Sequence, residues 1–336
     1  MHRALPSKFR LLFGLASLAL LAGLLGAVLL TQQSTASASA GADKLAMVYV
    51  GSFDRSVYAV NARTGAKVWS FPTGGSVFSS PAATTGLVYV GSGDGNLYAL
   101  NARTGAKVWS FLTGSAVVSS PTVAGGTVYI ASQDGNVYAL DARAGAEIWR
   151  FPTGSSIESS PTVAGNVVYI GSDDHDVYAL NARTGTQIWK TPTDDEVFSS
   201  PRVAGNVVYV GSVDGGVYAL NARTGAEIWK FPTDDEVFSS PTVAHGVVYI
   251  GSNDSRLYAL NARTGSEIWS FLTGDEVTSS PRVANGVVYF GALDNHLYAL
   301  NARTGAQIWK FLTGDTVESS PTLGASPGLT APASVG

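Results

Sequence analysis

Acidic side chains recur at one position of the chain, in loops that lie 40 residues apart. We call the following residues the acidic loops: Asp194, Asp195, Glu196, Asp234, Asp235, Glu236, Asp275 and Glu276. Carboxylates at this density could attract a basic partner or supply oxygen ligands to a divalent cation. The alternative interpretation is a solvated surface whose charge only keeps the protein soluble.

Two arginines break a regular pattern of the sequence. Arg202 and Arg282 stand where equivalent positions hold threonine or alanine, and Glu158 and Glu318 come just ahead of the same kind of segment. Side chains at these positions could line a channel and bind a small polar ligand. Ion pairs with neighbouring carboxylates are the alternative interpretation.

The residue types that catalysis needs are not assembled in the sequence. His175, His245 and His296 stand in different turns without the spacing of metal ligands, and no serine has a recognisable histidine and aspartate set around it. The absence of cysteine excludes disulfides, thiolate metal sites and cysteine nucleophiles. The net charge of −4 disfavours nucleic acid as a partner. We therefore predict a protein with no catalytic residue, no metal site and no cofactor.

A period of 40 residues governs the chain from its first tryptophan to its last. All tryptophans follow this period: Trp69, Trp109, Trp149, Trp189, Trp229, Trp269 and Trp309. Each ends a segment such as Asn221–Trp229, which reads NARTGAEIW. A fixed period of this length with β-branched and aromatic content indicates a repeat of short strands.

One copy of the repeat, residues 201–240, is expected to contribute four strands. Their predicted bounds are about 199–204, 207–212, 217–221 and 227–231. Turn sequences that begin at Gly205, Asp214 and Arg223 separate them. Seven such copies predict an all-β fold, a seven-bladed β-propeller of four-stranded blades.

The two ends of the repeat array complement each other. The first copy begins at Met47 without an innermost strand, and the last copy is followed by an extra one at residues 319–323. Pairing of that segment with the first copy predicts a ring closed by its N- and C-terminal strands. The propeller is expected to span residues 47–323, and the Gly-, Ala-, Ser- and Pro-rich residues 324–336 to form a disordered tail.

Alternating strand direction divides the loops of each copy into two sets on opposite faces. One set hardly varies and carries one arginine per copy, for example Arg223. The other set differs between copies and contains the acidic loops, so we expect the binding face there, because loops on a rigid scaffold often carry recognition. One aspartate per copy, for example Asp214, also lies there and is expected to cap its own turn.

The tryptophans are predicted to have a structural role. One per copy, near the outermost strand, should pack between neighbouring blades against backbone or glycine. A buried tryptophan removes roughly 150–250 Å² from water. At about 25 cal/mol per Å², each contact would contribute up to roughly 4–6 kcal/mol.

Residues 1–40 differ in composition from the repeats. Basic residues up to Arg10 precede twenty uncharged residues, 11–30, and Ala38-Ser39-Ala40 ends the segment. This order indicates a secretory signal peptide, and the apolar run is also long enough to be a retained membrane anchor. Either form predicts an extracytoplasmic protein, which is secreted, periplasmic or anchored facing outward, with a linker at residues 41–46.

The segment Ala99-x-Asn101-x-x-Thr104-Gly105-x-x-x-Trp109 resembles the tryptophan-docking motif of the pyrroloquinoline quinone (PQQ)-binding-like β-propeller repeat family. The resemblance covers residues 47–323 and implies the propeller fold. That family includes quinoprotein dehydrogenases and the non-enzymatic outer-membrane assembly propeller BamB. Its members often have eight blades, whereas this chain has seven copies.

Three functions are compatible with the resemblance and the residues. The first is a monomeric, non-enzymatic scaffold that binds a protein or a cell-envelope component, BamB-like in kind. The second is a PQQ-dependent quinoprotein dehydrogenase or quinone-binding protein, for which the family implies PQQ and Ca²⁺ and commonly a vicinal cysteine pair that this chain lacks. The third is a cation- or carbohydrate-binding propeller.

Small departures from the family pattern occur at Ala144, where threonine is usual, and in the asparagines that replace aspartate everywhere except Asp141.

Overall fold

The computed structural model describes residues 47–321. The predicted signal segment 1–40, linker 41–46 and tail 324–336 lie outside the described residues, as do Thr322 and Leu323 of the predicted closing strand. Within residues 47–321 the chain consists of strands and turns without a helix. Accordingly, this range offers no helical segment that could cross a membrane.

The strands form seven antiparallel sheets, here called blades 1 to 7, and strands that follow in sequence pair with each other. Blades 1 to 3 comprise β1 (Met47–Ser52), β2 (Ser56–Asn61), β3 (Lys67–Pro72); β4 (Ala82–Ala83), β5 (Leu87–Gly91), β6 (Asn96–Asn101), β7 (Lys107–Leu112); and β8 (Thr122–Ala124), β9 (Thr127–Ala131), β10 (Asn136–Asp141), β11 (Glu147–Pro152). Blades 4 and 5 comprise β12 (Thr162–Ala164), β13 (Val167–Gly171), β14 (Asp176–Asn181), β15 (Gln187–Pro192); and β16 (Arg202–Ala204), β17 (Val207–Gly211), β18 (Gly216–Asn221), β19 (Glu227–Pro232). Blades 6 and 7 comprise β20 (Thr242–Ala244), β21 (Val247–Ser252), β22 (Arg256–Asn261), β23 (Glu267–Leu272); and β24 (Arg282–Ala284), β25 (Val287–Ala292), β26 (His296–Asn301), β27 (Gln307–Leu312).

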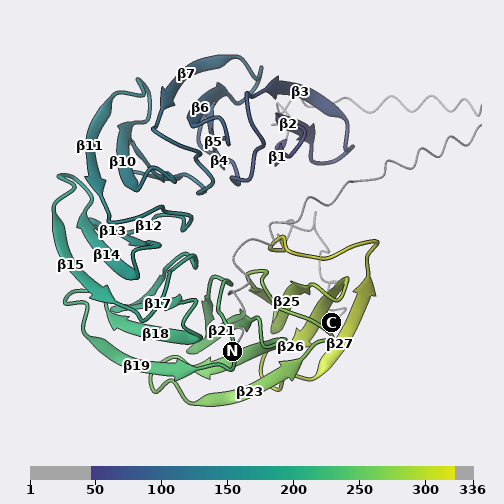
Figure 1. Cartoon of the computed structure of the whole chain (residues 1–336). Coiled ribbons are helices and arrows are strands. Elements are labelled where there is room, and N and C mark those ends of the chain that lie inside the picture. Colours follow the sequence, from purple (N-terminus) through teal and green to yellow (C-terminus); the bar gives the residue numbers. More distant parts are fainter. Residues whose placement is uncertain (1–46, 322–336) are drawn as a thin grey trace, which may run out of the picture. The chain divides into compact units, whose positions relative to one another are not determined.

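The blades follow one another in sequence order, with β7, β11, β15, β19 and β23 on the outer side (Figure 1). Blade 1 has three strands among the described residues, and each of the other six has four. The prediction of an all-β, seven-bladed propeller of four-stranded blades is therefore confirmed.

The innermost strand of each blade is shorter than the sequence suggested. In blade 5 it spans Arg202–Ala204 instead of residues 199–204. Pro201 has no amide proton for a strand ladder. Ser199 and Ser200 bond elsewhere, because the Gly211 amide donates to Ser199 Oγ at 3.1 Å and the Ser200 amide donates to the next blade.

The hydrophobic core lies between blades, so both faces of each central strand are buried. Val208 and Val210 of β17 pack toward Trp189 of blade 4. Tyr209, between them in sequence, packs toward Val248 of blade 6. The alternation expected for this strand is therefore present, and each of its two side-chain sets serves a different neighbouring blade.

A tryptophan of one blade donates a hydrogen bond to the backbone of the next blade. Trp229 Nε1 donates a hydrogen bond to the Ala262 carbonyl at 3.1 Å, and the Tyr209 hydroxyl donates to the same carbonyl at 2.9 Å. The Trp229 ring lies over Gly265, whose φ is 74°. A Cβ added to Gly265 would come within 2.7 Å of that ring. Equivalent hydrogen bonds are made by Trp69, Trp109, Trp149, Trp189 and Trp269.

The junction between blade 7 and blade 1 differs from the other six. Trp309 is 41% exposed, whereas Trp229 is 8% exposed. Val48 of β1 is also exposed, and no atom lies within 4 Å of a Cβ built on Gly65. Within residues 47–321 no fourth strand pairs with β1, so closure of the ring by residues 319–323 stays a prediction.

Candidate functional site

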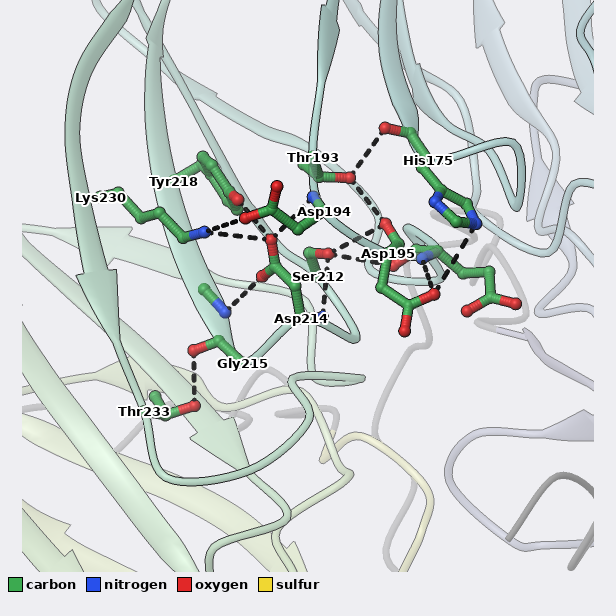
Figure 2. Close-up of polar contacts among 12 residues, drawn as sticks. His175, Thr193, Asp194, Asp195, Ser212, Asp214, Gly215, Tyr218, Lys230 and Thr233 are labelled. Carbon is green, nitrogen blue, oxygen red and sulfur yellow. Dashed lines mark hydrogen bonds and ion pairs between the residues drawn. The ribbon is translucent and has the colours of Figure 1, made fainter. Parts of the chain in front are cut away.

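The acidic loops connect the outermost strand of one blade to the innermost strand of the next. The loop after β15 is held by Thr193, whose hydroxyl donates to the carbonyls of His175 and Asp195 at 2.9 and 2.7 Å (Figure 2). The Val213 amide of blade 5 donates to the Glu196 carbonyl at 2.9 Å. Both ends of the loop are thus fixed to turns of neighbouring blades, which gives its carboxylates defined positions.

Asp214, the recurring aspartate of blade 5, has a wider role than the cap predicted for it. One carboxylate oxygen accepts the Gly216 amide of its own turn at 2.6 Å. The other accepts the Tyr218 hydroxyl and, from the preceding loop, the Asp194 amide at 3.0 Å (Figure 2). Lys230 Nζ lies 3.2 Å from both the Asp214 and Asp194 carboxylates. Asp214 therefore joins two blades, a contact that its position in the sequence did not reveal.

The hydrogen-bond donors around Asp214 lower its pKa more than burial raises it. Burial alone would raise the pKa of Asp214, but the bonds from Tyr218, the Asp194 and Gly216 amides and Lys230 hold it below its usual value. The carboxylate is therefore committed to structure and is not free to bind a ligand.

The acidic loops carry more negative charge than their surroundings neutralise. Burial raises the pKa of Glu236, and the charges of Asp235, Asp195, Glu276 and Glu196 raise it further. Carboxylates of three successive loops therefore act on one another electrostatically. The structure thus places Asp195, Glu196, Asp235, Glu236 and Glu276 within electrostatic reach of one another, whereas Asp194 lies beside Lys230.

Two aromatic rings lie beside these carboxylates. Phe198 and Phe238 follow the first two acidic loops and stack with their centroids 5.5 Å apart. Each ring is partly exposed. Phe78 shares this position, whereas Glu158 and Thr278 occupy it in other copies, so the phenylalanines were the available sequence signal.

Asp173 is the most perturbed carboxyl on this face. Burial, followed by the charge of Glu158, raises the pKa of Asp173 to about 7. Its Oδ1 is buried without a hydrogen-bond partner in the described part of the chain. Glu158 itself accepts a hydrogen bond from Gln133 Nε2 at 3.0 Å, away from Arg202 and Arg282.

One cluster has the composition of a metal site. Ligand atoms of His175, Asp195 and Glu196 all lie within 4.8 Å of one another. His175 Nε2 is 3.7 Å from Asp195 Oδ1 (Figure 2). A nitrogen and carboxylate oxygens in this arrangement suit a divalent transition metal. The spacing of the histidines alone predicts no metal site at His175, because its partners Asp195 and Glu196 stand about 20 residues away, on the next loop.

The channel residues proposed from sequence separate into two groups. Arg202 and Arg282 line a cavity of about 300 Å³ between the innermost strands of blades 4 to 7. Glu158 and Glu318 are exposed and do not line that cavity. The structure therefore brings together the two arginines without the two glutamates.

Comparisons with known proteins agree with the fold. A family model described as the beta-propeller of the beta-alanine-activating enzyme matches residues 33–247, and one described as outer membrane protein assembly factor BamB matches residues 213–331. No curated protein matches the sequence.

Several solved structures share the architecture. BamB from Moraxella catarrhalis is 20% identical, with a TM-score of 0.72 over 82% of this chain and 88% of that chain. A europium-containing methanol dehydrogenase is 14% identical, with a TM-score of 0.70 over 82% of this chain and 78% of that chain. The quinohemoprotein alcohol dehydrogenase ADHIIG from Pseudomonas putida HK5 is 18% identical, with a TM-score of 0.71 over 82% of this chain and 66% of that chain. At these identities the likeness concerns the fold alone.

Proposed function

The chain belongs to the PQQ-like β-propellers, in the family of the beta-alanine-activating enzyme propeller, and on this scaffold we propose a non-enzymatic binding function. The partner is a basic protein surface that docks on the acidic loops. The observation that carries the proposal is the set of carboxylates on successive blades, whose charges add to the effect of burial in raising the pKa of Glu236. Such a surface attracts and orients a positively charged partner.

The neighbourhood of the acidic loops also suits a protein partner. Phe198 and Phe238 supply an apolar contact between the first loops, and aromatic groups surrounded by polar residues are typical of protein interfaces. The loops are fixed by hydrogen bonds to neighbouring turns, so little conformational entropy is lost on binding.

The proposed location is outside the cytoplasm, at the cell envelope. The basic, apolar and small-residue order of residues 1–40 supports it. The partial match to an outer membrane protein assembly factor is consistent with that location and with a scaffold role.

A quinone-dependent dehydrogenase is less well supported by the residues. PQQ is a tricarboxylate, and the loops that vary between blades present carboxylates that would repel it. The cavity at Arg202 and Arg282 offers cationic groups, but its lining of arginine, serine, threonine and proline provides no aromatic ring for a flat quinone to stack on. We therefore assign no cofactor to the proposed function.

The proposal is tested by binding of a labelled peptide that contains lysine and leucine, measured by fluorescence anisotropy. Neutralising one loop (D234N, E236Q and D235N together) removes three charges. At about 0.5 kcal/mol for each exposed charge pair, the affinity should fall roughly tenfold.

The matched control carries E147Q, E227Q and E267Q on the outer strands. It changes the net charge by the same amount as the loop variant does. This control should bind the peptide as the parent protein does. Equal weakening by both variants would show that only net charge matters, and the assignment of the acidic loops as the binding surface would then be wrong.

A further inference from the structure

The cavity between the innermost strands of blades 4 to 7 is a second, chemically opposite site on the molecule. Its volume is about 300 Å³, at the lower end of the range of small-molecule pockets. Arg202 of β16 and Arg282 of β24 line it. Thr162 and Thr242 occupy the equivalent positions in blades 4 and 6, so the arginines are departures from the repeat.

Neither arginine is neutralised by the wall of the cavity. Both side chains are exposed to it, and within residues 47–321 neither guanidinium makes an ion pair or a hydrogen bond. In the strand ladder Arg202 lies opposite Tyr209, and Arg282 lies opposite Tyr289. No carboxylate of residues 47–321 belongs to the cavity lining, and a guanidinium keeps its charge at all physiological pH values.

The threonines of the adjacent strands do not accept hydrogen bonds from the arginines. The Thr162 hydroxyl donates to the Pro201 carbonyl at 2.6 Å, and the Thr242 hydroxyl donates to the Pro281 carbonyl at the same distance. Those bonds join neighbouring blades and occupy the carbonyls that precede the two arginines.

A row of serines adds further donors. Ser200, Ser240 and Ser280 line the cavity, and the oxygen of each accepts an amide proton from the preceding blade at 2.9–3.0 Å. A hydroxyl has one proton to donate, and no acceptor for these protons is found among the described residues. The wall therefore presents two guanidinium groups and several hydroxyl donors.

We propose that this cavity binds a small dianion through Arg202 and Arg282. The planar guanidinium bonds carboxylate and phosphate oxygens in pairs, which suits both kinds of anionic group. The cavity volume limits the ligand to a small molecule. This site does not depend on the acidic loops, whose charge repels the same ligands.

The test uses isothermal titration calorimetry of the full chain with succinate and, separately, with inorganic phosphate. Acetate serves as the monoanion. We expect saturable binding of succinate or phosphate and at least tenfold weaker binding of acetate. No saturable binding of either dianion in the millimolar range, or acetate bound as tightly as succinate, would overturn the proposal.

The chain itself supplies conservative variants. R202T and R282T restore the residue that blades 4 and 6 have at this position, so the fold should be retained, and a thermal melt checks this. Each single variant should weaken dianion binding at least tenfold, and the double variant should abolish it. R223T with R263T removes two positive charges from exposed turns and should leave binding unchanged. Binding that survives in the double variant, or that falls equally in the turn variant, would contradict the assignment.

Discussion

Asp173 shows how a single side chain on the acidic face can work against the fold. Burial is the main cause that raises its pKa to about 7, and the charge of Glu158 adds to it. One of its oxygens is buried without a partner in the described chain. A carboxyl in this environment disfavours the folded state whenever it is ionised.

The sign of the pH effect follows from this pKa. Because the folded-state pKa lies above the ordinary value of 3.8, the native protein holds this proton more tightly than the unfolded chain. The penalty is absent below about pH 4 and grows until about pH 7. We predict that D173N is more stable than the parent at pH 8, and that the difference disappears near pH 4.

Urea unfolding at pH 4 and pH 8 measures this difference. E158Q removes the second cause of the raised pKa, so it should move the pH dependence of the parent toward lower pH. A stability difference between D173N and the parent that is the same at both pH values would contradict the assignment.

At the scale of the blade, the repeated strand unit is the part of the structure that the sequence predicts best. The three outer strands of blade 5 lie within a residue of their expected bounds, because turn residues such as Gly205 and Asp214 mark both ends. The innermost strand was predicted too long, because Ser199 bonds through its side chain to Gly211 of β17 and the Ser200 amide donates to the next blade.

Contacts between blades could not be predicted from the pattern of one blade. Asp214 meets the Asp194 amide, and His175 meets Asp195, in each case across 20 residues. A separation of 20 residues is half the repeat period, so the repeat pattern does not indicate that such residues meet. Their contact depends on how one sheet is placed against the next. For the same reason, the sequence pattern did not show that Arg202 lines the cavity while Glu158 bonds to Gln133 outside the lining.

The tryptophan junction gives a prediction at this scale. Trp229 is 8% exposed and bonds the Ala262 carbonyl, so W229A should lower the free energy of unfolding by about 3–5 kcal/mol. Chemical denaturation gives this value directly. W309A is the matched variant, because Trp309 is 41% exposed.

W309A should lower the free energy of unfolding clearly less than W229A, because Trp309 is far less buried. An equal cost would show that blade 7 docks on blade 1 and would support ring closure by the terminal strands. A negligible cost for W229A would instead show that the tryptophans are not the contacts that hold neighbouring blades together.

At the scale of the whole molecule, the propeller separates charges of opposite sign. The acidic loops lie in the connections between blades, and the two arginines without an ion pair among residues 47–321 lie in the cavity between innermost strands. A rigid scaffold of seven similar blades allows this, since single substitutions in loops or inner strands leave the core contacts unchanged. We assign protein binding to the first site and binding of a small dianion to the second.

We propose that this scaffold binds a partner and does not catalyse a reaction. The most direct test incubates the full chain with PQQ and Ca²⁺ and follows dye-linked oxidation of alcohols and sugars. We expect no dye reduction above that of PQQ and Ca²⁺ without protein. Saturable, protein-dependent turnover of any of these substrates would contradict it and would make the protein a quinone-dependent dehydrogenase.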